Sequence, residues 1–154
     1  MKDRWVPIGL LAGALFLVNV VARLVTRFGF DANPEVEDRV SLGMFAVIAV
    51  ILAVLAFIWG RQHPLSRWGA DLAGAVLIAL ALTVFVGPLV SGSYPFANGA
   101  GSFFSQIWLY AAFTFGGTVV GYLVLIALGR DHRSRSLQQY SEAKLAKPRR
   151  VVRR

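Results

Sequence analysis

The sequence contains no cysteine and only two histidines. Without cysteine the chain cannot form disulfides, thiolate metal sites, iron–sulfur clusters or a cysteine nucleophile. His63 and His132 both lie outside the long apolar stretches, so this chain alone cannot hold a haem between two histidines inside a membrane. Because no catalytic, metal-binding or cofactor-binding spacing stands out either, we expect no enzymatic activity, no metal and no cofactor.

Charged residues are nearly absent from four long apolar stretches, approximately 5–28, 40–60, 69–90 and 106–129. Hydrophobic residues make up 56% of the chain. A helix of about 20 apolar residues crosses the ~30 Å hydrocarbon core of a bilayer. The sequence therefore predicts an all-α membrane protein, with a four-helix transmembrane domain over 1–129 and a basic cytoplasmic tail over 130–154.

The first stretch follows Lys2 and Arg4, as the apolar region of a signal peptide would. Its apolar core over 6–22 is longer than the ~7–15 residues usual for such a region. Arg23 and Arg27 follow where small cleavage-site residues would be expected. We therefore interpret it as a retained first helix.

The charges of the connections predict the orientation. The 61–68 connection and both terminal segments are basic, whereas the loop over 91–105 carries no charge. Positive charge favours the cytoplasmic side, which predicts an up-down-up-down bundle with both termini in the cytoplasm. Arg23, Arg27 and Arg39 oppose this orientation, but acidic neighbours and the basic tail outweigh them. The composition is typical of a bacterial protein, so we expect a multi-pass protein of a bacterial plasma membrane.

Tryptophan positions support the same membrane borders. Trp5, Trp59 and Trp68 lie at the expected cytoplasmic ends of three helices, and Trp108 lies near the expected outer end of the fourth. Indole rings favour the headgroup level, with the apolar ring inward and the N–H in the wet zone. All four tryptophans are therefore expected at the interface.

Small residues recur four positions apart in every apolar stretch. This spacing lets helices approach closely in lipid, where the hydrophobic effect contributes little to helix association. Short connections favour sequential helices as antiparallel neighbours. The pattern predicts a compact bundle with one face left for a partner. The pairs are Gly9 and Gly13, Ala49 and Ala53, Ala70 and Gly74, Ala75 and Ala79, and Gly117 and Gly121.

Four polar residues within the stretches are candidates for a polar or ion path: Asn19, Asp71, Thr83 and Thr114. The alternative for Asn19 and the threonines is hydrogen bonding between helices. Asp71 is the only carboxylate within a stretch and could carry a proton or bind a cation. It also lies near a helix start, where the helix dipole favours negative charge.

Arg23 and Arg27 lie four residues apart, hence on one helical face, and could contact an anionic lipid headgroup or a partner. The alternative is pairing with the acidic segment over 31–39, together with extension of their side chains to the interface. That segment could bind calcium, but its spacing is not that of an EF-hand. A turn at Asn33-Pro34 followed by an acidic first helical turn fits it better.

The uncharged loop over 91–105 and the tail are the candidate contact surfaces. Gly87-Pro88 is expected to kink or end the third helix before this loop. The loop aromatics suit either the outer headgroup zone or a neighbouring protein. The basic tail favours anionic lipids, and nucleic-acid binding has little support. The contact candidates are Tyr94, Phe96, Phe103 and Phe104 of the loop, and Arg149, Arg150, Arg153 and Arg154 of the tail.

Three function classes remain open from the sequence. The first is a non-catalytic accessory or scaffold subunit of a larger membrane complex, which the absence of chemical motifs and the small-residue faces favour. The second is a protomer of an oligomeric channel or small transporter, which requires the polar residues to share one cavity. The third, a lipid-modifying enzyme using acidic residues near the outer interface, has the least support.

Overall fold

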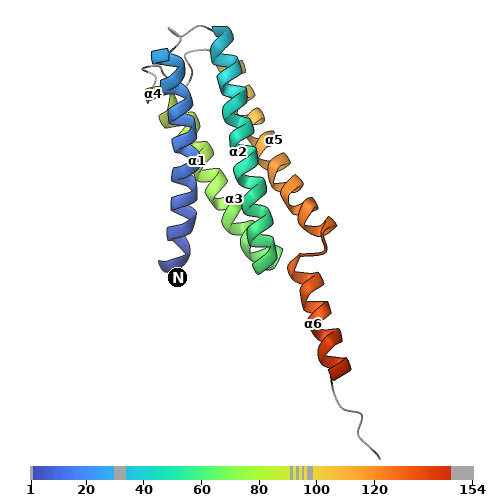
Figure 1. The fold of residues 1–154 in the computed structure, drawn as a ribbon. Coiled ribbons are helices and arrows are strands. Elements are labelled where there is room, and N and C mark those ends of the chain that lie inside the picture. The colour runs from blue at the N-terminus through green and yellow to red at the C-terminus, as the bar shows by residue number, and fades with distance from the viewer. Residues whose placement is uncertain are drawn as a thin grey trace, which may run out of the picture.

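The computed structural model describes residues 2–29, 34–90, 92, 94, 96 and 99–146. Every element within these residues is helical, and four helices are long and apolar enough to cross a membrane. Figure 1 shows the long helices packed side by side, with a shorter helix extending beyond them. The elements are α1 (Lys2–Gly29), α2 (Pro34–Gln62), α3 (Leu65–Ala81), η1 (Leu82–Val86), α4 (Gly87–Val90), α5 (Gly99–Ala127) and α6 (His132–Ala146).

The third span is one helix, Leu65–Val90, that contains a π-helical turn. Within η1, the Gly87 N–H donates to the Leu82 carbonyl five residues earlier. Pro88 has no N–H to donate to the preceding turn, and a single π turn is a common way for a helix to absorb such an interruption. The sequence predicted a kink or an end at Gly87-Pro88. The helix is interrupted by a π turn just before Gly87 and continues to Val90, the last residue of the predicted stretch.

The closest backbone approach joins α2 and α5. Added Cβ atoms at Gly117 and Gly121 would overlap the backbone of Ala49 and Ala53 respectively. The two predicted small-residue pairs therefore face one another. Ala49 of α2 lies beside Gly117 of α5, and Ala53 lies beside Gly121. Because the numbers rise together along both helices, the two helices run in the same direction.

The third span packs in the same way against α1. Gly74 lies beside Ile8, and Gly87 lies beside Asn19. The closest contacts thus join helices separated by one other helix along the chain. Sequential helices were expected to be antiparallel neighbours, and they do contact one another. The closest approaches nevertheless lie elsewhere, because the glycines that permit them lie on α5 and on the third span.

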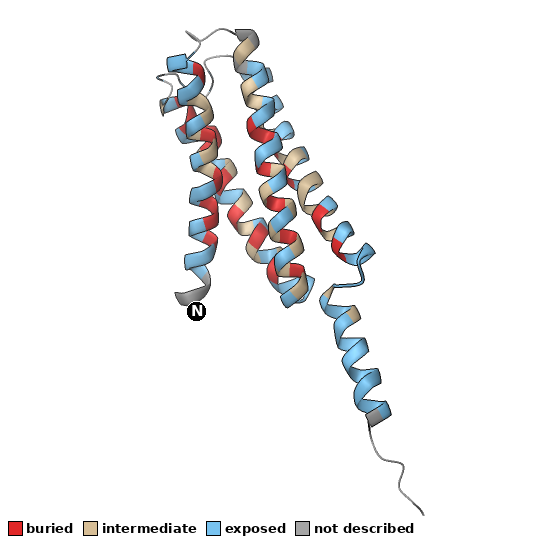
Figure 2. Cartoon of the chain, in the orientation of Figure 1, coloured by how far each residue is buried: buried red, intermediate tan, exposed pale blue. Residues whose placement is uncertain are grey.

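The core lies where the long helices face one another. Figure 2 shows buried residues on these inner faces, whereas the outer faces and α6 are mainly exposed. Large apolar side chains fill the core, including Leu15, Ile48, Leu52, Leu72 and Leu125. The outward-facing apolar side chains suit lipid as the surrounding medium.

Two tryptophans have surroundings that the sequence did not indicate. Trp68 is only 2% exposed and packs against Tyr122, with ring centroids 5.7 Å apart. It faces the neighbouring helix because it lies on the inner face of α3. The helix α5 begins at Gly99, earlier than expected, so Trp108 lies about 13 Å along the helix at 1.5 Å per residue.

Candidate functional site: a polar contact between α1 and the π-helical span

Asn19 lies at the centre of a buried polar contact between three helices. Its side chain is 1% exposed, and Nδ2 donates to Sδ of Met44 on α2 at 3.0 Å. Its Oδ1 accepts from Nε of Arg23, one turn later on α1, at 3.1 Å. This outcome agrees with the structural alternative for Asn19, an interhelical hydrogen bond, and it places Arg23 in the same contact.

Gly87 provides the third side of this contact. A Cβ there would lie 2.9 Å from Asn19 Oδ1 and 3.0 Å from Arg23 Nε. Contacts this short are closer than ordinary packing allows, so even the smallest side chain would force a shift. The bare backbone at Gly87 therefore lets the amide and the guanidinium lie against the end of the π turn.

Arg27 is exposed and extends this contact to the end of the third span. Its Nη1 donates to the Val90 carbonyl at 3.3 Å, and its guanidinium also lies near Gly92. A cation beside the last carbonyls of a helix is favourable, because the helix dipole places negative charge there. The expected acidic partners at 31–35 and Glu37 lie outside the described side chains, so this carbonyl is the partner that the structure identifies.

The other polar candidates occupy different environments. The Thr114 hydroxyl donates to the Tyr110 carbonyl of its own helix at 2.8 Å. Thr83 is fully buried in η1, and its hydroxyl has no hydrogen-bond partner within the described part of the chain. Asp71 is half-buried, twelve residues before Thr83 and hence about 18 Å away along the helix. The four residues therefore do not form one polar group.

Sequence reasoning missed Met44 and Tyr110. The Tyr110 side chain is fully buried, and its hydroxyl also lacks a partner among the described residues. Its ring packs edge-to-face on Phe45 at a centroid distance of 6.3 Å. Tyr110 and Tyr122 are both tyrosines within an apolar stretch, which was an available signal, whereas nothing distinguished Met44 from an apolar core residue.

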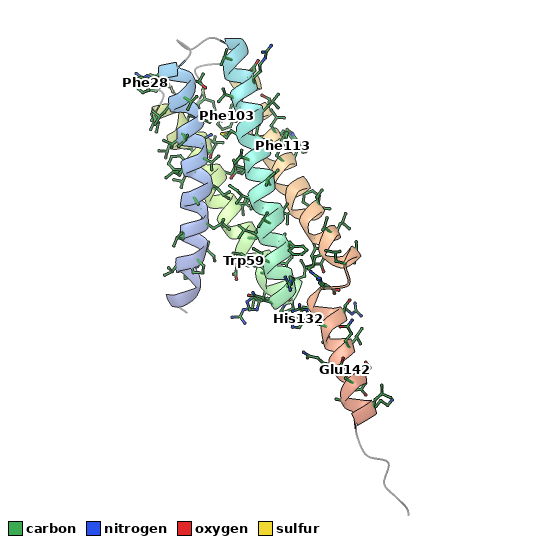
Figure 3. The ribbon with its side chains drawn as sticks, viewed as in Figure 1. Phe28, Trp59, Phe103, Phe113, His132 and Glu142 are labelled. Atoms are coloured by element: carbon green, nitrogen blue, oxygen red, sulfur yellow. The ribbon has the colours of Figure 1, made fainter. Side chains whose placement is uncertain are left out.

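Three of the four predicted loop aromatics, Phe96, Phe103 and Phe104, form a cluster. Phe103 lies toward the same end of the bundle as Phe28 (Figure 3). Phe103 stacks on Phe96 at 4.6 Å and also contacts Phe104 and Phe85. Tyr94 is 79% exposed. The cluster links the loop to η1 and α5. The four tail arginines, Arg149, Arg150, Arg153 and Arg154, lie outside the described residues.

At the other end of the bundle, Asp131 forms the start of α6. Its Oδ2 accepts from the Ser134 backbone N–H at 3.3 Å, and its carbonyl accepts from the Arg135 N–H at 3.1 Å. Hydrogen bonding with Ser134, first by its side chain, lowers the pKa of the Asp131 carboxyl. Figure 3 shows His132 and Glu142 on this projecting helix. The residues in this region are mostly exposed.

The described residues contain no group of three His, Cys, Asp or Glu side chains that could hold a metal ion. The amide, guanidinium and thioether of the central contact join helices and supply no nucleophile. Comparisons with protein-family models, curated proteins and solved structures find no match.

Proposed function

We propose that this protein is a non-catalytic accessory or scaffold subunit of a larger membrane complex. In this proposal it crosses the plasma membrane four times in an up-down-up-down arrangement, with both termini in the cytoplasm. The order of the contacts supports this threading. Gly74 and Gly87 lie beside Ile8 and Asn19 in that order, so the first and third spans are parallel, and the contacts of Gly117 with Ala49 and of Gly121 with Ala53 make the second and fourth parallel.

An open small-residue pair on α1 carries the proposal. Gly117 and Gly121 pack against the backbone of α2, whereas added Cβ atoms at Gly9 and Gly13 would meet nothing within 4 Å among the described residues. Val6 and Leu10 beside this pair are 65% and 71% exposed. One small-residue pair thus packs a helix within the molecule, and a second is available to a transmembrane helix of another protein.

The channel or transporter alternative has less support. A path through the bundle needs polar groups that face a common cavity along its length. Thr114 bonds to its own helix, and Asn19 bonds to Met44 and Arg23. Asp71 lies about 18 Å from Thr83 along the helix. Asn19 thus joins two helices and the Thr114 hydroxyl is satisfied by its own helix, which suits a packed bundle better than a pore.

Anionic lipids are the second proposed partner. Arg133, Arg135 and Lys144 are exposed on α6, which continues from the end of the fourth span. Each such residue near an anionic leaflet contributes about 1 kcal/mol to membrane-surface binding. Nucleic acid has no comparable support.

The test is purification of the tagged full chain from its native membrane in mild detergent, followed by mass spectrometry of the bound proteins. We expect a stoichiometric set of larger membrane proteins, lost in Gly13→Ile. The matched control is Gly43→Ile, at an exposed glycine of α2 that also faces open space. Recovery of the chain alone or only with copies of itself, or equal loss of partners in both variants, would contradict the proposal.

A further inference from the structure

Two hydroxyl groups in the bundle are buried without a protein partner. Thr83 and Tyr110 are both 0% exposed, and neither hydroxyl forms a hydrogen bond within the described part of the chain. In a membrane, bulk water cannot reach such groups, and an unpaired buried hydroxyl is costly. The two hydroxyl groups belong to η1 and α5, which contact one another. We therefore look for one explanation for both.

Thr83 lies next to the polar contact on α1. It precedes Gly87 by one turn, and Gly87 lies against Asn19 and Arg23. The π turn adds a second polar group here. Gly87 donates to Leu82, but Pro88 has no N–H to donate to the Thr83 carbonyl, the next acceptor in the π series.

Tyr110 lies on α5, which contacts η1. Its ring packs on Phe45, and the adjacent residue Met44 accepts the Asn19 hydrogen bond. A tyrosine on a helix leans toward the helix N-terminus. For Tyr110 this direction is toward Phe103, which contacts Phe85 of η1.

We propose that Thr83 and Tyr110 share one ordered water molecule in a buried polar site beside the Asn19 contact. Water is the ligand of the right chemistry, because it is small, neutral, and both donates and accepts hydrogen bonds. Buried waters make about three hydrogen bonds to otherwise unpaired groups. The two hydroxyls supply two of these partners, and a backbone carbonyl such as that of Thr83, which receives no hydrogen bond from Pro88, can supply another. This water stabilises the π turn, and the inference does not depend on the accessory role.

The first test measures the thermal unfolding midpoint of full-chain variants in lipid or mild detergent and asks whether it falls. Thr83→Val and Tyr110→Phe remove only the hydroxyls. If the hydroxyls hold one water, each variant lowers the unfolding midpoint by about 2–4 °C. The double variant then lowers it no further than the larger single change. Thr118→Val is the control, because its hydroxyl bonds to the Thr114 carbonyl of its own helix. Unchanged or raised midpoints, or additive losses, overturn the proposal.

The second test detects the water in the folded protein and does not depend on unfolding. Solid-state NMR in bilayers measures magnetisation transfer from water to the Thr83 methyl group. The Ala79 methyl, equally buried one turn earlier on the same span, is the reference. Faster transfer to Thr83 than to Ala79, slowed in Tyr110→Phe, supports the shared water. Equal transfer to the two methyl groups, or no effect of Tyr110→Phe, overturns it.

Discussion

Gly87 lies directly against Asn19: a Cβ at position 87 would be 2.9 Å from the Asn19 amide oxygen. Asn19 cannot easily yield, because its amide also bonds to Met44 and Arg23. The contact between α1 and the third span therefore depends on the missing side chain at Gly87.

We accordingly expect Gly87→Ala to destabilise the bundle by about 1–3 kcal/mol, the usual cost of overpacking. Gly74→Ala is the matched control, since it lies on the same span against the same helix but its nearest neighbour atom is 4.0 Å away. Reversible unfolding in mixed detergent micelles measures both. Equal stability of the two variants would show that the Asn19 contact is looser than the structure indicates.

The sequence predicts the four spans well, because length and apolar composition alone determine which helices can cross a membrane. It also identifies Asn19 as an interhelical hydrogen-bonding residue, since an amide deep in a span needs a partner. The sequence does not identify that partner, because Met44 is apolar by every pattern and becomes an acceptor only through the packing of α2 against α1.

The π turn and the pairing of the helices could not be predicted from the sequence either, because both depend on how the helices pack. Gly87-Pro88 predicts an interruption, but the surrounding packing decides whether a helix ends there or gains a residue in one turn. Small-residue pairs predict close approach without specifying partners. Gly117 and Gly121 meet Ala49 and Ala53, whereas Cβ atoms added at Gly9 and Gly13 would meet nothing within 4 Å in the described part of the chain.

The close approach of α2 and α5 gives a second prediction. Gly121→Ala would place a Cβ onto the backbone of Ala53, and no side-chain rotation can relieve an overlap with backbone. We expect the helices to separate and the free energy of unfolding to fall by at least about 1–3 kcal/mol.

Gly116→Ala is the control for this substitution, because a Cβ there meets nothing within 4 Å. Alanine also favours the helical state over glycine by about 1 kcal/mol in soluble helices. We therefore expect no loss at 116 when the two variants are unfolded under the same conditions. A Gly121→Ala protein as stable as Gly116→Ala would rule out the α2–α5 contact as described.

The burial of Trp68 gives a third prediction, for fluorescence. Trp68 is 2% exposed and packs on Tyr122, whereas Trp5 is 69% exposed. In variants that retain a single tryptophan, we expect an aqueous quencher to reduce Trp5 emission more strongly than Trp68 emission in bilayers. Phenylalanine replaces the other three tryptophans in both variants. Equal quenching of the two variants would show that Trp68 is as accessible to water as Trp5, and would contradict its burial against Tyr122.

The start of α6 gives a fourth prediction, for its pH dependence. Asp131 caps the helix by accepting from the Ser134 backbone N–H, and its folded pKa lies below the ordinary value of 3.8. A lowered folded pKa means that the carboxylate stabilises the capped helix above the ordinary pKa. This stabilisation is lost as the pH falls through the folded pKa. Amide NMR shifts of Ser134 and Arg135 should therefore remain helical at neutral pH and move toward unfolded values in strong acid.

Asp131→Asn separates the charge of the cap from its geometry. Asparagine also caps helices, so we expect α6 to form in this variant but to lose the acid transition of its first turn. Glu142→Gln is the control, because it removes the same charge from the middle of α6 and leaves the cap in place. If the acid transition persists in Asp131→Asn, or disappears in Glu142→Gln, the transition belongs to another group. The break between α5 and α6 is then not governed by Asp131.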